Sequence, residues 1–74
     1  MRLEVECYAG TRADERPVRF RIGRRCVEVT EILDRWLGED HRYFKVRGDD
    51  GATYILRLDL EADRWDLTWF DRSR

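Results

Sequence analysis

The stretch "RYFKVRGDDGATYILR", residues 42–57, contains two alternating runs on either side of the turn sequence Asp49-Asp50-Gly51. Apolar residues at every second position predict half-buried antiparallel strands, and the Asp-Gly pair predicts a tight turn between them. A two-residue turn would place Lys45 opposite Leu56 and so mix the two faces. A three-residue turn keeps the apolar residues together and gives Gly51 the positive φ that such a turn requires.

This three-residue turn fixes the register of the hairpin. Its pairs are Val46 with Tyr54 and Phe44 with Leu56 on the inner face, and Lys45 with Ile55 on the outer face. The next hairpin follows from the alternating run at 65–69, and its pairs are Leu58 with Trp65, Leu56 with Leu67, Tyr54 with Trp69 and, outside, Arg57 with Asp66. Trp65 and Trp69 are therefore expected in the core, and Phe70 on the outward side.

The segment "RCVEVTEILDRWLG", residues 25–38, has two interpretations. Its apolar residues have a helical spacing, which predicts a short helix at 30–37 that ends at Gly38. Equally, Val27 and Val29 begin a strand that one bulge near residues 30–31 would allow to continue. The β-rich surroundings favour the long bulged strand.

Similar alternation at residues 3–7 and 18–22 completes the pattern. The chain is expected to form one all-β domain over residues 1–74. Six antiparallel strands in a meander, separated by regular turn signals, are typical of a small barrel or roll of SH3-like or OB-like type.

Composition limits the classes of function. The 16 acids and 15 bases nearly cancel to a net charge of -1, so the whole chain has no general attraction for phosphate. No stretch approaches the ~20 apolar residues that span a membrane, and the N-terminus has no signal-peptide pattern. We therefore expect a soluble, cytoplasmic protein without membrane contact.

Side chains that commonly bind metals or act in catalysis are few. The chain has two cysteines, Cys7 and Cys26, and one histidine, His41, which excludes a four-ligand zinc site, and no cofactor is expected. Cys7 continues the apolar alternation of the first strand and is expected to be a buried, reduced thiol. Phosphate-binding loops and hydrolase motifs are absent from the sequence, and the only serine is Ser73, so we expect no catalysis.

The run "RPVRFRIGRR", residues 16–25, contains five arginines. Arg19 and Arg21 are expected to point outward, beside glutamates of the neighbouring strands, which predicts a solvated ladder of ion pairs. The alternative is a groove that follows a nucleic-acid backbone, because the guanidinium group binds phosphate through two hydrogen bonds. Its candidate residues are Arg19, Arg21, Arg24, Arg25, Lys45 and Arg47, of which Arg24 and Arg25 lack an obvious acidic partner.

Three aromatic residues are candidates for contacts with a protein. Trp36 is a potential anchor, Phe70 would form an exposed apolar patch with Ile55, and Tyr43 lies among bases on an outward face. An aromatic residue among bases is also how OB-type folds bind single strands. For Tyr43 the simpler interpretation is a cation–π contact with Arg57.

The segments "ERPVRFRIGRR", "VEVTEILDRW", "RYFKVRGDDGATYILR" and "RWDLTWF" cover most of residues 16–70. They resemble a family of small uncharacterised bacterial proteins, a domain of unknown function. Related domains are attached to the C-termini of some bacterial proteins that resemble lesion-bypass DNA polymerases. The resemblance implies an accessory module without catalytic residues, and it connects the nucleic-acid alternative with DNA repair.

These observations lead to one main hypothesis and one alternative. The chain is expected to be a small non-catalytic binding module, monomeric or homodimeric, whose partner is a protein. The alternative is a nucleic-acid-binding accessory module that uses the arginine-rich face.

Overall fold

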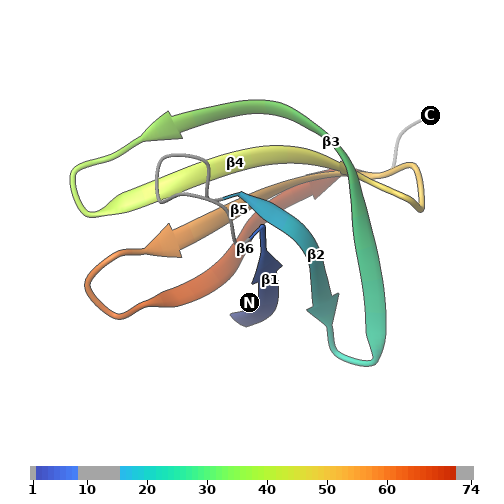
Figure 1. Ribbon diagram of the computed structural model, residues 1–74, viewed down its shortest axis with the longest axis horizontal. Helices are drawn as coiled ribbons and strands as arrows, with labels where there is room; N and C mark the ends of the chain where they lie inside the picture. Colours follow the sequence, from blue (N-terminus) through green and yellow to red (C-terminus); the bar gives the residue numbers. More distant parts are fainter. Residues whose placement is uncertain (1, 9–15, 72–74) are drawn as a thin grey trace.

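The computed structural model describes residues 2–8 and 16–71, and the regular structure of these residues is entirely β-strand. The strands are β1 (Arg2–Cys7), β2 (Pro17–Ile22), β3 (Arg25–Leu37), β4 (His41–Gly48), β5 (Thr53–Asp59) and β6 (Arg64–Asp71). Each strand pairs antiparallel with the next, and β6 pairs with β1, so the sheet closes into a barrel (Figure 1). The predicted six-stranded antiparallel barrel is confirmed.

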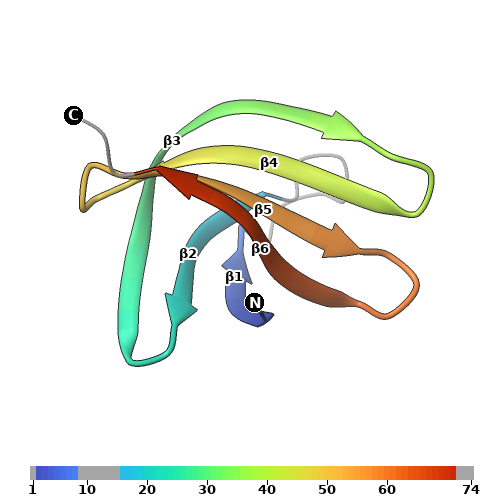
Figure 2. The ribbon, with the colours of Figure 1, turned by 180° about the vertical axis from the view of Figure 1, so that it is seen from behind.

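The long strand β3 is shared between two parts of the barrel. Residues 25–28 pair with β2, and the remainder of β3 pairs with β4. The register with β4 shifts between Val29 and Glu31 and again between Ile32 and Asp34. Extra residues of this kind bend a strand, and Figures 1 and 2 show β3 curving from one side of the barrel to the other. The bulged strand is confirmed, with two bulges rather than one, and the helix at 30–37 is wrong.

The hairpin of β4 and β5 has the predicted register. Lys45 pairs with Ile55 and Val46 with Tyr54. Gly51 has a φ of 85°, and its amide donates to the carbonyl of Gly48 at 3.0 Å. The alternation of side chains therefore selects the turn length correctly.

The hairpin of β5 and β6 follows the prediction over only part of its length. Leu58 pairs with Trp65 and Leu56 with Leu67, but the register then shifts, so that Ile55 pairs with Trp69. Thr68 is the extra residue, and its hydroxyl donates to the carbonyl of Ile55 at 3.1 Å. The predicted pair of Tyr54 with Trp69 is wrong, because a single added residue moves every later side chain to the other face.

The core lies inside the barrel and draws on every strand except β6, whose Trp65 and Leu67 pack against it half-buried. Its fully packed members are Leu3, Phe20, Val27, Phe44, Val46, Ala52, Tyr54 and Leu56. Gly48 is buried where β4 meets the bent β3, and a Cβ atom there would lie 2.5 Å from Cγ1 of Val27. Glycine is thus required at this position for the close approach of the two strands.

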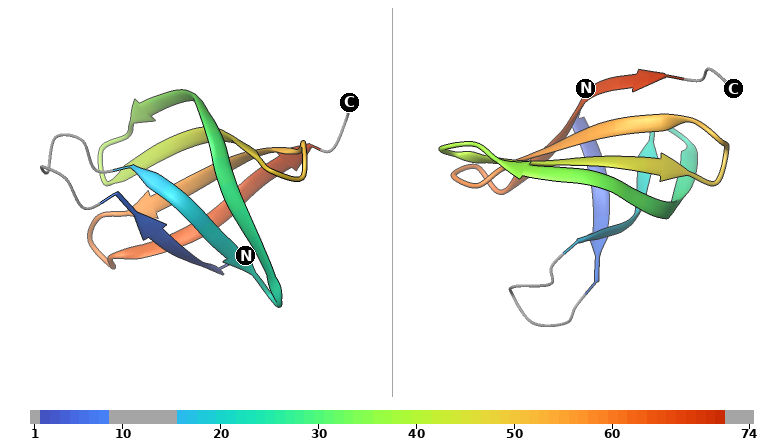
Figure 3. Two further views of the ribbon diagram at one scale, coloured as in Figure 1. Left: turned by 45° about the vertical axis from the view of Figure 1, so that its right-hand side comes forward. Right: turned by 90° about the horizontal axis from the view of Figure 1, so that it is seen from above.

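The barrel is closed by a short seam between its first and last strands. Among the described residues, β1 and β6 share two pairs, Arg2 with Asp66 and Leu3 with Trp65. Figure 3 shows the hairpin of β1 and β2 set steeply across the sheet of β3–β6. Two outward faces result, one over β1, β2 and the start of β3, the other over β3–β6.

Candidate interaction surface

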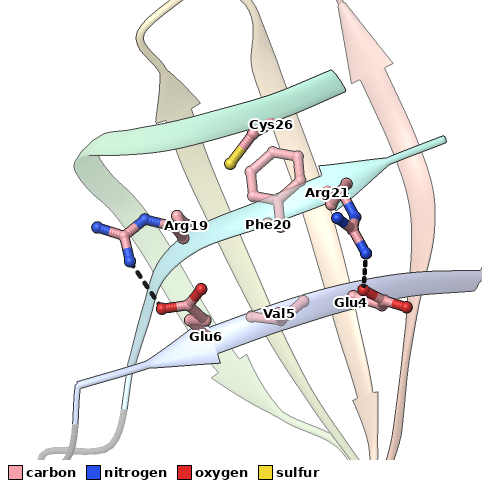
Figure 4. Close-up of a pocket in the computed structure, with 7 residues that line it drawn as sticks. All are labelled: Glu4, Val5, Glu6, Arg19, Phe20, Arg21 and Cys26. Carbon is pink, nitrogen blue, oxygen red and sulfur yellow. Dashed lines mark hydrogen bonds and ion pairs between the residues drawn. The ribbon is translucent and has the colours of Figure 1, made fainter. Parts of the chain in front are cut away.

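The face over β1, β2 and the start of β3 carries the predicted ladder of ion pairs. Arg19 donates to Glu6 at 2.7 Å, and Arg21 pairs with Glu4 at 2.6 Å (Figure 4). On its other side, Arg19 donates to Glu28 at 2.8 Å. The hydrogen bond to Glu28, followed by that to Glu6, raises the pKa of Arg19 above its ordinary value. We call these five residues, Glu4, Glu6, Arg19, Arg21 and Glu28, the charge ladder; its two arginines are neutralised by three glutamates.

A shallow hollow of about 240 Å³ lies on this face and is lined by charge-ladder residues together with Val5, Phe20 and Cys26 (Figure 4). Its charged walls are the ion pairs just described, so it offers a ligand no uncompensated charge. Cys26 is exposed, and Cys7 is half-buried rather than buried as predicted, because the pairs of β1 with β6 end at Leu3 and the register with β2 shifts between Glu6 and Cys7. The described residues contain no cluster of three or more side chains placed to bind a metal ion.

Arg25 has an acidic partner that the sequence did not reveal. Its guanidinium group pairs with Asp50 at 2.8 Å and donates to the hydroxyl of Tyr54 at 2.9 Å, while that hydroxyl donates to Asp50. Burial raises the pKa of Asp50, but the bonds from Tyr54 and the Ala52 amide, together with the charge of Arg25, outweigh it and hold that pKa below its ordinary value. This cluster joins β3 to the turn of the next hairpin.

The second face, over β3–β6, collects aromatic side chains. Trp36 pairs with Tyr43 across the strands, and their rings stack with centroids 5.3 Å apart and planes 6° apart. Ile55 and Trp69 pair on the same outward side of β5 and β6. Trp36 and Trp69 are 41% and 46% exposed, which is unusual for the largest apolar side chain. We call these four residues, Trp36, Tyr43, Ile55 and Trp69, the aromatic face.

Two aromatic predictions change with the shift of register in β6. Trp69 takes the outward position beside Ile55 that was predicted for Phe70. Phe70 pairs instead with Tyr54, on whose ring it stacks at 5.9 Å, and it remains 53% exposed. Phe70 is thus on the opposite side of the sheet from Trp36 and Tyr43. The ring of Tyr43 stacks on Trp36, and the one cation–π contact among the described residues is that of Arg16 with Tyr8.

Lys45 and Arg47 lie on β4 at the border of the aromatic face. Lys45 is opposite Asp34, and Arg47 is opposite Glu31 on β3. None of these four side chains forms an ion pair within the described part of the chain. We call them the charge columns, acidic on β3 and basic on β4. Arg57, farther along the face, pairs with Asp66 at 3.4 Å.

The candidate residues thus do not form a single site. Arg19 and Arg21 belong to the charge ladder, Arg25 is bound to Asp50, and Arg24 lies in the turn after β2, with no ion pair among the described residues. Trp36, Tyr43, Lys45 and Arg47 come together on one face. Trp69 is the member of that face that sequence reasoning missed. The only available signal was Thr68, since a threonine hydroxyl can bond to the facing strand at a bulge.

Comparisons with known proteins add no relative, because no family model, curated protein or solved structure matches the chain. Within the described residues there is no helix of the length and hydrophobicity needed to cross a bilayer.

Proposed function

We propose that the chain is a non-catalytic cytoplasmic module that binds a partner protein through the aromatic face. The observation that carries this proposal is the outward placement of two half-exposed tryptophans, a stacked tyrosine and an isoleucine on one continuous sheet. Exposed apolar patches rimmed by polar groups mark interaction sites, and tryptophan and tyrosine are the residues enriched at energetically important contacts.

The charges around this face favour a protein over a nucleic acid. Each base of the charge columns lies opposite an acid, and Arg57 is paired with Asp66. These neighbouring acids and bases provide little net attraction for a phosphate backbone. Attraction for phosphate dominates the affinity of nucleic-acid-binding proteins. The mixed charges suit the polar rim of a protein interface.

A photo-crosslinking experiment tests the proposal. The protein is produced in cells of its source organism, with a benzophenone amino acid in place of Ile55 on the aromatic face. The control carries the same amino acid in place of Glu4 on the charge ladder. We expect discrete protein adducts from position 55 that are lost when Trp36→Ala is added, and none from position 4. Adducts removed by nuclease, or equal adducts from both positions, would contradict the proposal.

The nucleic-acid alternative has its own measurement. Labelled single- and double-stranded oligonucleotides are titrated with the protein at about 50 and about 200 mM salt and followed by fluorescence anisotropy. We expect no saturable binding at either salt concentration, because the arginines of the charge ladder are neutralised. A groove with six phosphate contacts would instead bind at low salt and lose roughly a thousandfold in affinity at the higher salt.

A further inference from the structure

We propose that a second copy of this chain covers the β3–β4 part of the aromatic face. The dimer is symmetric, and its two-fold axis lies in the plane of the face, between β3 and β4 and parallel to them. This inference rests on the proposed function, since it names the partner of the same surface.

The first argument is the contrast between the two outward faces. On the charge ladder every arginine is bound to a glutamate at 2.6–2.8 Å. On the β3–β4 face the acids and bases are neighbours in register, yet no ion pair joins any of the four within the described residues. The charge columns are therefore available to a partner that presents the opposite charges.

The second argument is that the charge columns complement themselves. Rotation about the proposed axis places β3 of one copy over β4 of the other and keeps each residue at its level along the strands. Asp34 then faces Lys45 of the second copy, and Glu31 faces Arg47 of the second copy. Because the contact is isologous, each pair occurs twice, so four ion pairs of opposite charge form across the interface.

The aromatic residues fit the same operation. Trp36 faces Tyr43 of the second copy, again twice, so the two stacked ring pairs meet one another. Aromatic rings in offset contact add to the stabilisation that burial of their area provides. Trp36 is 41% exposed in the single chain, and the dimer would cover it.

The competing axis between β4 and β5 is less favourable. It would place Lys45 over Ile55 and Asp34 over Trp69, and so would remove charges from water against apolar side chains without a partner. The charge columns thus select the axis between β3 and β4. Trp69 remains outside the contact.

The contact is small. Six side chains from each copy take part, which is fewer than the roughly 20–30 residues that each partner contributes to a standard interface. We therefore expect a weak dimer, best measured by sedimentation equilibrium between about 10 µM and about 1 mM chain.

Charge-reversal variants test the register of this dimer. At the level of Asp34 and Lys45, the variant Asp34→Lys makes both charge columns basic, and Lys45→Glu makes both acidic. Each variant alone is therefore expected to remain monomeric up to the highest concentration. An equimolar mixture of the two is expected to form a heterodimer, because the opposite columns then face one another. Both substitutions are at partly exposed outward positions, and circular dichroism checks that each variant is folded.

Substitution of the tryptophans provides a matched pair. Trp36→Ala is expected to weaken the wild-type dimer about tenfold or more, which corresponds to about 1.4 kcal/mol. Trp69→Ala, a change of the same residue type at similar exposure on the same face, is expected to leave it unchanged. An equal loss in both variants would overturn the proposed axis.

Two further outcomes would overturn the inference. One is a wild-type chain that stays monomeric at about 1 mM, and the other is an equimolar mixture of the charge variants that does not associate. If crosslinking from position 55 still captured a different protein, only the second copy would be excluded and the proposed function would stand. If neither association nor an adduct were observed, both would fail.

Discussion

Replacement of Gly48 by alanine is expected to lower the melting temperature by about 10 °C or more. The added Cβ would lie 2.5 Å from Cγ1 of Val27 and 2.8 Å from Oδ1 of Asp50, inside a fully packed region. Overpacking of a core typically costs about 1–3 kcal/mol, and one kilocalorie shifts the melting temperature of so small a domain by about 4–8 °C. Thermal unfolding followed by circular dichroism measures the effect.

A double substitution separates this clash from a general effect of losing a glycine. When Val27→Ala is combined with Gly48→Ala, the opposing methyl group is removed. The free energy of unfolding lost in the double variant should therefore be smaller than the sum of the losses in the two single variants. Gly38→Ala is the control, because a Cβ at that position would meet its nearest atoms at 3.4 Å. Strict additivity of the pair would contradict the close approach of β3 and β4.

Replacement of Asp50 by asparagine is expected to destabilise the fold at neutral pH by about 2 kcal/mol, because hydrogen bonds to a charged group contribute about 1.5–3 kcal/mol. The carboxylate accepts bonds from Tyr54, Arg25 and the Ala52 amide at once. Burial and the bond to Asp50 raise the pKa of Tyr54, so the hydroxyl remains a donor. Urea denaturation of both proteins gives the difference.

The pH dependence of this difference has a definite sign. The pKa of Asp50 is lowered in the folded protein, so its contribution to stability is complete above the unfolded pKa of about 3.9 and is lost as the pH falls through the folded value. The wild type should therefore approach the stability of Asp50→Asn below about pH 4. Asp49→Asn, in the same turn, serves as the control. A difference that stays constant down to about pH 2 would contradict the role of the carboxylate.

Much of the fold can be predicted because alternate residues of a β-strand point to opposite faces of the sheet. The register of Phe44, Val46 and Tyr54 follows from keeping apolar side chains together, and the charge ladder follows from acids and bases at matching positions of adjacent strands. Such local rules hold wherever the pairing is regular.

The predictions fail where the pairing is irregular. The bulge at Thr68 exchanges the faces to which Trp69 and Phe70 point. The alternation of apolar and polar residues does not indicate where an extra residue interrupts the strand. A bulge within β3 contains the same hydrogen bond from a threonine to the facing strand, since the hydroxyl of Thr30 donates to the carbonyl of Arg47 at 3.1 Å. The partner of Arg25 was also missed, because Asp50 lies in another hairpin and meets it only after β3 has bent.

The short seam between β1 and β6 bears on the order in which the chain folds. The strands β3–β6 are joined by tight turns, so their contacts form between residues that are close in sequence. The seam joins strands from opposite ends of the chain, so its formation closes a long loop and carries an entropic cost. The two residue pairs of the seam offset this cost only after the core has formed. The four-stranded meander is therefore expected to belong to the folding nucleus. We expect closure by β1 to follow late and its release to be the earliest step of unfolding.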